Sequence, residues 1–287
     1  MKNLFIFPVL LLWASVGFSQ NDQPQAEAAF ITEAGDPFEE QVIDGVVERR
    51  IIVENRVLPY EPVREADVPW EKKIWSVINV REKINLPFAY PKMPFFTILA
   101  DAAKNGEFSV YKDDDFKDIM TVSELEGKLF SVDTVSVTDP ETYEVTLAIT
   151  RSDLNPSDIQ RFRVKEVIFF DKKASRVKRR ILGIAPIKDV IDKTTGQLLY
   201  PEPLFWVYYP QAREALSKYR VFNAENDAAP MTWDMVLEEH MFSSYIFKES
   251  NVMDRRLQDY LTGIDILHES QKIKDRLFNF EQDLWEY

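Results

Sequence analysis

The sequence predicts an α+β protein with two related strand-helix units, an extended N-terminal arm and a helical C-terminus. Three observations support this fold class. Stretches that alternate apolar and polar residues, typical of strands, recur between stretches with the 3.6-residue periodicity of amphipathic helices. Similar motifs recur at offsets of 109 and 111 residues beyond position 70. An apolar content of 45% is enough for a packed core.

Residues 1–19 have the pattern of a signal peptide. A single lysine precedes an almost wholly apolar stretch from Leu4 to Ala14, and small residues stand where signal peptidase cleaves. The apolar stretch is shorter than the roughly 20 residues that a membrane-spanning helix needs. We therefore expect export, cleavage before Gln20, and a mature chain without a membrane span.

Composition and charge exclude several kinds of site and partner. The chain has no cysteine, which excludes a disulfide framework and a lipid anchor attached through a thioether. Its formal net charge of −13 argues against nucleic acid, because binding to phosphates needs a surplus of Lys and Arg on the contacting surface. If the protein works at a membrane, a partner has to hold it there.

Residues 20–69 are expected to form an extended, partly flexible arm. The first half is rich in Ala, Glu, Gln, Asp and Pro and has few large apolar residues, so burial cannot offset the entropy cost of ordering it. Residues 46–53 are predicted to form one strand or extended segment. Three prolines, Pro59, Pro62 and Pro69, then keep the chain out of helix.

Two α+β units are predicted over residues 70–150 and 151–250, and their similarity indicates an internal duplication. The corresponding positions are Pro94 and Pro203, Phe96 and Phe205, Ala103 and Ala212, Met120 and Met231, and Thr121 and Thr232. The second unit carries an insertion, residues 187–202, that is predicted to form a hairpin. In the first unit, residues 131–137 and 143–150 are predicted to form a strand pair.

Helix starts are predicted at two threonines and a proline. Thr121 has Glu124 three residues later, which is the spacing of a capping box, whereas Thr232 lacks the acidic partner. Pro210 is placed to lie in the first turn of another helix.

Residues 251–287 are predicted to form helices that dock on the second unit. One apolar face comprises Met253, Leu257, Leu261 and Ile264, and after Gly263 a second face comprises Leu267, Ser270, Ile273, Leu277, Phe280 and Leu284. The aromatic side chains at the end of the chain are Phe278, Phe280, Trp285 and Tyr287. We expect them to pack against the protein or a partner, because exposed they would form a sticky patch.

The sequence contains no recognisable catalytic, cofactor-binding or metal-binding pattern, so we do not expect an enzyme. Neither histidine, His240 or His268, has a second ligand at metal spacing, and both are predicted to be structural. Residues 113–115 are three consecutive aspartates, but their spacing is not that of an EF-hand and favours a solvated turn over a cation site. No serine lies in a Gly-x-Ser-x-Gly elbow, and no glycine-rich phosphate loop is present.

Residues 203–210 contain six bulky residues between two prolines and allow two interpretations. The aromatic side chains here could stack on the sugar rings of a cell-wall glycan; they are Tyr200, Phe205, Trp206, Tyr208 and Tyr209. The enclosing prolines and the continuous apolar run favour a buried strand instead.

A basic block follows a strand-like stretch, residues 161–170. Its cations are Lys172, Lys173, Arg176, Lys178, Arg179 and Arg180. In an acidic chain such a patch can pair with the acidic surface of an identical subunit or of another acidic protein. A run of charges can equally be a solvated hairpin edge, and the sequence leaves both interpretations open.

Several aromatic motifs resemble a known family. They are residues 203–210 (PLFWVYYP), 242–252 (FSSYIFKESNV), 254–256 (DRR) and 277–286 (LFNFEQDLWE), and residues 75–91 resemble the first half of the same family. On these motifs the chain resembles the gliding-motility family GldN, also called PorN. The resemblance covers essentially the whole mature chain.

The resemblance implies a periplasmic, non-enzymatic component of the type IX secretion system, which exports proteins across the outer membrane and supports gliding. It implies self-association in a ring with the outer-membrane lipoprotein GldK (PorK), and communication with GldL and GldM (PorM). The basic block and the aromatic C-terminal side chains are then the candidate contact residues. The alternative function is a periplasmic module that binds cell-wall glycan.

Overall fold

The computed structural model describes residues 56–138, 145–191, 198–226 and 228–284, all within the compact unit Asp36–Tyr287. The predicted signal peptide, the arm up to residue 55 with its predicted strand at 46–53, and both Trp285 and Tyr287 lie outside the described residues. No helix in the described ranges is long and apolar enough to cross a membrane.

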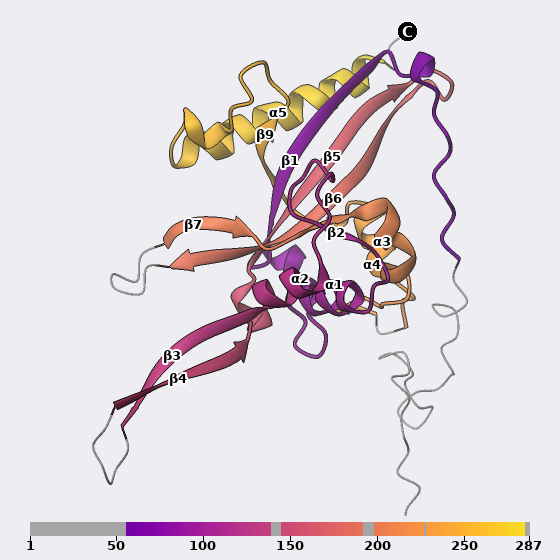
Figure 1. The fold of residues 1–287 in the computed structure, drawn as a ribbon. Coiled ribbons are helices and arrows are strands. Elements are labelled where there is room, and N and C mark those ends of the chain that lie inside the picture. The colour runs from indigo at the N-terminus through magenta and orange to yellow at the C-terminus, as the bar shows by residue number, and fades with distance from the viewer. Residues whose placement is uncertain (1–55, 139–144, 192–197, 227, 285–287) are drawn as a thin grey trace, which may run out of the picture. The chain divides into compact units, whose positions relative to one another are not determined.

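A seven-stranded antiparallel sheet forms the framework, and the predicted α+β class is confirmed (Figure 1). The strands are β1 (Trp70–Asn79), β2 (Val110–Tyr111), β5 (Arg161–Asp171), β6 (Arg176–Ile191), β7 (Leu198–Pro203), β8 (Trp206–Tyr208) and β9 (Tyr245–Glu249). Their order is β2-β8-β6-β5-β1-β9, and β7 also pairs with β6. Strands from both predicted units therefore share one sheet, because β1 pairs with β5 along its whole length.

Two predicted strand pairs are confirmed. β3 (Phe130–Thr138) and β4 (Val145–Asp153) form a separate two-stranded sheet. The insertion at residues 187–202 contributes the end of β6 and most of β7, which pair with each other. The connections at 139–144 and 192–197 lie outside the described residues.

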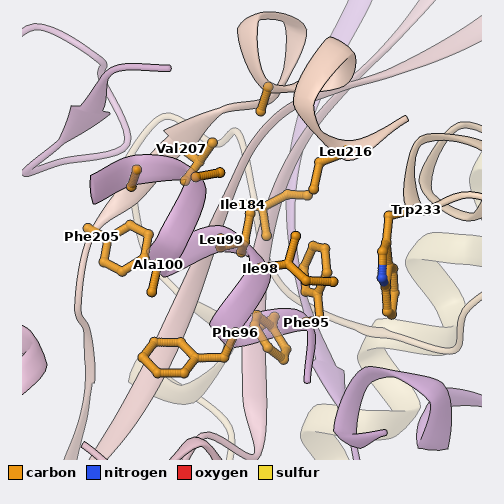
Figure 2. Close-up of a cluster of buried hydrophobic side chains, with 14 of the residues drawn as sticks. Phe95, Phe96, Ile98, Leu99, Ala100, Ile184, Phe205, Val207, Leu216 and Trp233 are labelled. Atoms are coloured by element: carbon orange, nitrogen blue, oxygen red, sulfur yellow. The ribbon is translucent and has the colours of Figure 1, made fainter. Parts of the chain in front are cut away.

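Short helices cover one face of the sheet. They are α1 (Phe95–Lys104), α2 (Val122–Leu129), α3 (Tyr209–Leu216) and α4 (Trp233–Glu238). Further 3-10 segments are Glu65–Asp67, Lys83–Ala89 and Pro156–Asp158, and the first of these lies against the turn between β5 and β6, where Asp67 O accepts from Lys172 N. Phe95 of α1 and Trp233 of α4 lie 4.4 Å apart between ring centroids, and both belong to the main core with Ile184 of β6 (Figure 2). Burial of each such large side chain stabilises the fold by about 1.5–3 kcal/mol.

The predicted helix caps are confirmed. Thr121 forms a capping box with Glu124 at the start of α2. The Thr232 side chain accepts from the Met235 amide at the start of α4, without an acidic partner. Pro210 lies in the first turn of α3. Each cap is worth roughly 1 kcal/mol of stability.

In both segments at offset 111, a backbone hydrogen bond joins the corresponding valine and methionine before a helix begins. Met120 N donates to Val110 O before α2, and Val221 N donates to Met231 O before α4. Further upstream the conformations differ, since Pro94 immediately precedes helix α1 whereas the corresponding Pro203 ends strand β7. Internal duplication of the whole unit stays a prediction.

Residues 251–284, the described part of the C-terminal region, contain one α-helix, α5 (Ile264–Asp283), which packs beside β9 (Figure 1). The predicted helix through Met253 and Leu261 is wrong, because only the 3-10 turn Leu257–Asp259 forms there. The Asn251 side chain bonds both the amide and the carbonyl of Arg255, and this local bonding competes with helix formation.

Candidate interaction surface

The basic block comprises the turn between β5 and β6, residues 172–175, and the first residues of β6. Asp171 organises this turn, because its carboxylate accepts from the amides of Lys173 and Ala174 at 2.9 and 3.1 Å. The same carboxylate pairs with Lys178 Nζ at 2.6 Å, and this hydrogen bond lowers the pKa of Asp171. One cation of the block is therefore committed to holding the hairpin.

The arm crosses one face of the block. Successive side chains of a strand point to opposite faces, so Lys178 and Arg180 share a face and Arg179 lies on the other. Arg180 Nη2 donates to Glu61 O at 3.0 Å, and Lys178 Nζ lies 3.2 Å from Glu61 Oε2. The Arg180 guanidinium also lies 4.7 Å from the centre of the Tyr60 ring.

The same segment of the arm is held from α3 and α4. The Arg213 guanidinium lies 4.4 Å from the Tyr60 ring centre, and its Nη1 donates to Leu58 O at 3.0 Å. The Tyr60 hydroxyl donates to the Glu238 carboxylate. Burial raises the pKa of Tyr60, and the hydrogen bond to Glu238 adds to this. We call residues 58–61 with their four partner side chains, Lys178, Arg180, Arg213 and Glu238, the arm clasp.

A buried network fixes the position of Arg213. Asp234 is buried and accepts from Arg213 Nε at 3.0 Å, from Nη2 at 3.3 Å and from the Tyr209 hydroxyl at 2.8 Å. Burial raises the pKa of Tyr209, and the charge of Asp234 raises it further. Bidentate pairs of this kind hold a guanidinium in one orientation, so the clasp has a rigid base.

Three cations of the block remain exposed at the end of the hairpin. Among the described residues, Lys172, Lys173 and Arg176 have no side-chain partner. We call these three residues the cationic tip. The structure thus divides the six predicted residues into two that hold the arm, three at the tip, and Arg179 on the opposite face. Their role in partner contact stays a prediction.

The aromatic side chains at the end of α5 are not equivalent. Phe280 packs on Trp70 of β1, with 4.5 Å between ring centroids. Phe278 is 60% exposed, so it remains available for contact with a partner. Trp285 and Tyr287 lie outside the described residues.

The aromatic stretch at residues 203–210 belongs to the core. Trp206 is only 4% exposed and Phe205 is fully buried, whereas Tyr208 is half-buried. Trp206 is therefore not available to stack on a sugar ring. The stretch forms the end of β7, the strand β8 and the start of α3.

The three aspartates at residues 113–115 do not all lie in a solvated turn. Asp114 accepts from Trp75 Nε1 at 2.7 Å and lies 3.3 Å from Nζ of Lys165, a lysine that is buried in the sheet. Burial alone would raise the pKa of Asp114, but the Trp75 hydrogen bond and the Lys165 charge outweigh it and lower that pKa. Within the described part of the chain, no three His, Asp or Glu side chains are placed to hold a metal ion.

The arm clasp is the feature that the sequence did not indicate. Tyr60 stands between Pro59 and Glu61 in a segment predicted only to be extended, and Arg213 lies 153 positions later on a short helix. The one available signal was an aromatic residue between two prolines, which keep the backbone extended and present the ring.

The comparison with protein families covers the sheet and its helices but not residues 58–61 of the arm clasp. A family model described as gliding motility associated protein GldN matches residues 63–286. The match contains every strand and α-helix of the structure, including the cationic tip and α5. The chain belongs to the GldN family. The earlier resemblance to GldN is thereby confirmed, and the chain is a member of a family associated with gliding motility. No curated protein matches the chain.

Proposed function

We propose that the chain is a non-enzymatic structural component of the type IX secretion and gliding machinery. It is exported to the periplasm and forms a ring with the outer-membrane lipoprotein GldK (PorK), which holds it at the membrane. The family match over residues 63–286 carries this proposal, because it extends over the whole sheet and not over a single motif. Contacts with GldL and GldM complete the proposed set of partners.

The charge distribution supports repeated contacts between copies. A closed ring of identical subunits requires two different surfaces on each subunit that fit one another. The cationic tip, Lys172, Lys173 and Arg176, provides a compact positive surface on a chain whose net charge is −13. A positive surface of this kind favours encounter with the acidic surface of the next subunit or of the lipoprotein.

Charge reversal of the cationic tip tests this proposal. The variant Lys172→Glu/Lys173→Glu/Arg176→Glu leaves the arm clasp and the core untouched. Its matched control is Lys83→Glu/Lys92→Glu/Lys104→Glu, which has the same change in charge at exposed lysines outside the hairpin. Both are purified with the lipoprotein, and the yield of large assemblies is measured by light scattering at low and high salt.

We expect the tip variant to assemble poorly at low salt and the control to assemble like the parent chain. The difference between the parent and the tip variant should shrink at high salt, because salt screens charges at a wet interface. Equal assembly by the tip variant and the control at low salt would show that the tip is a solvated hairpin edge.

A further inference from the structure

A cavity of about 700 Å³ lies on the face of the sheet that α5 covers, between α5 and the loop that follows α4. Its apolar walls include Ile74, Ile168 and Ile246 from the strands and Leu277 from α5. It is therefore deep enough to remove an alkyl chain from water.

Polar groups without partners form the floor of this cavity. Ser76 in β1 and Glu166 in β5 are polar residues at the centre of the sheet, and both are buried, with 2% and 4% of their surface exposed. Ser76 Oγ has no hydrogen-bond partner, and neither has Nε2 of His240, which lies 3.5 Å from Glu166 Oε1. Buried polar atoms in folded proteins are almost always hydrogen-bonded, so this group calls for a ligand.

The hydrogen bonding of His240 shows which kind of group is missing. Its Nδ1 lies 3.0 Å from the carbonyl oxygen of Glu238, and a carbonyl oxygen can only accept. Nδ1 therefore carries the hydrogen, and in the neutral ring Nε2 is an acceptor. The Glu166 carboxylate accepts as well, and Ser76 Oγ can do so. The floor can therefore offer three acceptors to a ligand that donates hydrogen bonds.

Two cations also line the cavity, and Lys274 lies close enough to Glu166 for their charges to interact. Arg179 lies on the face of β6 away from the arm clasp, and the Lys274 side chain donates to Ser244 O. Both side chains line the cavity, together with Glu281 and the exposed ring of Phe278. The two cations can therefore meet a carboxylate that is bound beside the floor.

We propose that this cavity binds a primary alkylammonium group, with Glu166, His240 and Ser76 accepting its three hydrogens. An ammonium group has three donors and no acceptor, which matches the floor. Its alkyl chain lies between the isoleucines and Leu277. The source is either a free amino acid, whose carboxylate meets Arg179 and Lys274, or a lysine side chain of a polypeptide.

Three probes added to the full mature chain separate these sources in a calorimetric titration. Nα-acetyl-L-lysine amide offers only a side-chain ammonium, and L-norleucine offers an α-ammonium with a carboxylate and an apolar chain. Nα-acetyl-L-norleucine amide keeps the apolar chain and has no ammonium. We expect one or both ammonium probes to bind and the third probe not to bind. Binding of L-norleucine alone identifies a free amino acid, and binding of the lysine derivative alone identifies a polypeptide lysine.

Glu166→Gln keeps the size of the side chain and removes the charge, so it should weaken ammonium binding at least tenfold. Glu126→Gln, a change at an exposed residue of α2, is the charge-matched control and should bind like the parent chain. If Glu166→Gln does not fold, Ser76→Ala replaces it and should weaken binding severalfold. The proposal is overturned if no ammonium probe binds, if the uncharged probe binds equally well, or if the floor variants bind as tightly as the parent.

Discussion

Removal of the Tyr60 hydroxyl tests whether the arm clasp holds residues 58–61 on the hairpin. Tyr60→Phe keeps the ring beside Arg180 and Arg213 and deletes only the hydrogen bond to Glu238. A hydrogen bond to a charged group contributes about 1.5–3 kcal/mol. Because both partners are partly exposed, we expect the low end, about 1.5 kcal/mol.

The expected readout is limited proteolysis with trypsin at the flanking residues Arg56 and Arg64, both of which are exposed. Cleavage of a transiently opened segment follows its open population, so 1.5 kcal/mol corresponds to a roughly tenfold faster cut. Tyr60→Ala also removes two cation–π contacts of about 0.5–1 kcal/mol each and should be cut about tenfold faster again.

Tyr200→Phe is the matched control, because Tyr200 on β7 is exposed and has no hydrogen-bond partner among the described residues. It should be cut at the parent rate. If Tyr60→Phe and Tyr200→Phe were cut at Arg56 and Arg64 equally slowly, the hydroxyl would not hold the arm and the reasoning behind the clasp would be refuted.

Three further changes test the buried contacts. Arg213→Met should lower the free energy of unfolding by about 3 kcal/mol, because it leaves the buried Asp234 carboxylate without its cation. Gly183→Ala should lower it by about 1–3 kcal/mol, since the new Cβ would lie 2.4 Å from Phe116 Cζ. Glu124→Gln should make the free energy of unfolding depend less on pH in the acid range. The hydrogen bond from a lysine lowers the pKa of Glu124 from 4.5 to about 2, so its contribution is complete above pH 4.5 and lost as the pH falls to 2.

Chemical denaturation measures these three changes, and each has a control of the same type. Arg276→Met removes an exposed ion pair and should cost less than about 1 kcal/mol. Gly127→Ala lies in α2 with open space around the new Cβ and should stabilise the protein by about 0.5–1 kcal/mol. Glu126→Gln removes an exposed carboxylate of the same helix and serves as the control for Glu124→Gln. Any variant that behaved like its control would contradict the contact assigned to it.

Local patterns were sufficient for much of the fold. The capping box at Thr121, the cap at Thr232 and the helix start at Pro210 depend on residues within four positions of one another, and all three are confirmed. The strand pairs at β3–β4 and β6–β7 join neighbours in the sequence, and alternation with turn residues was enough to find them.

Contacts between distant segments were not predictable. β1 joins the sheet by pairing with β5 about ninety positions later, and the hydrophobic period of β1 does not say which strand it will meet. The arm clasp was not predictable for the same reason, since Tyr60 contacts side chains from three elements that only folding brings together. At Asn251 a side-chain bond to the backbone overrode an apolar spacing that was typical of a helix.

The cationic block shows how the structure narrows a surface that the sequence predicted. The sequence alone did not distinguish among the six cations, because a run of charged residues does not show which partner each side chain will contact. In the structure Lys178 and Arg180 contact Glu61 of the arm, so charge reversal at Arg180 would also release the arm. Substitutions at the cationic tip avoid this ambiguity.

The most direct test of the proposed function is electron microscopy of the purified mature chain mixed with the outer-membrane lipoprotein GldK. We predict closed rings that contain both proteins. Particles that remained single subunits, with no complex between the two proteins, would contradict the proposed ring.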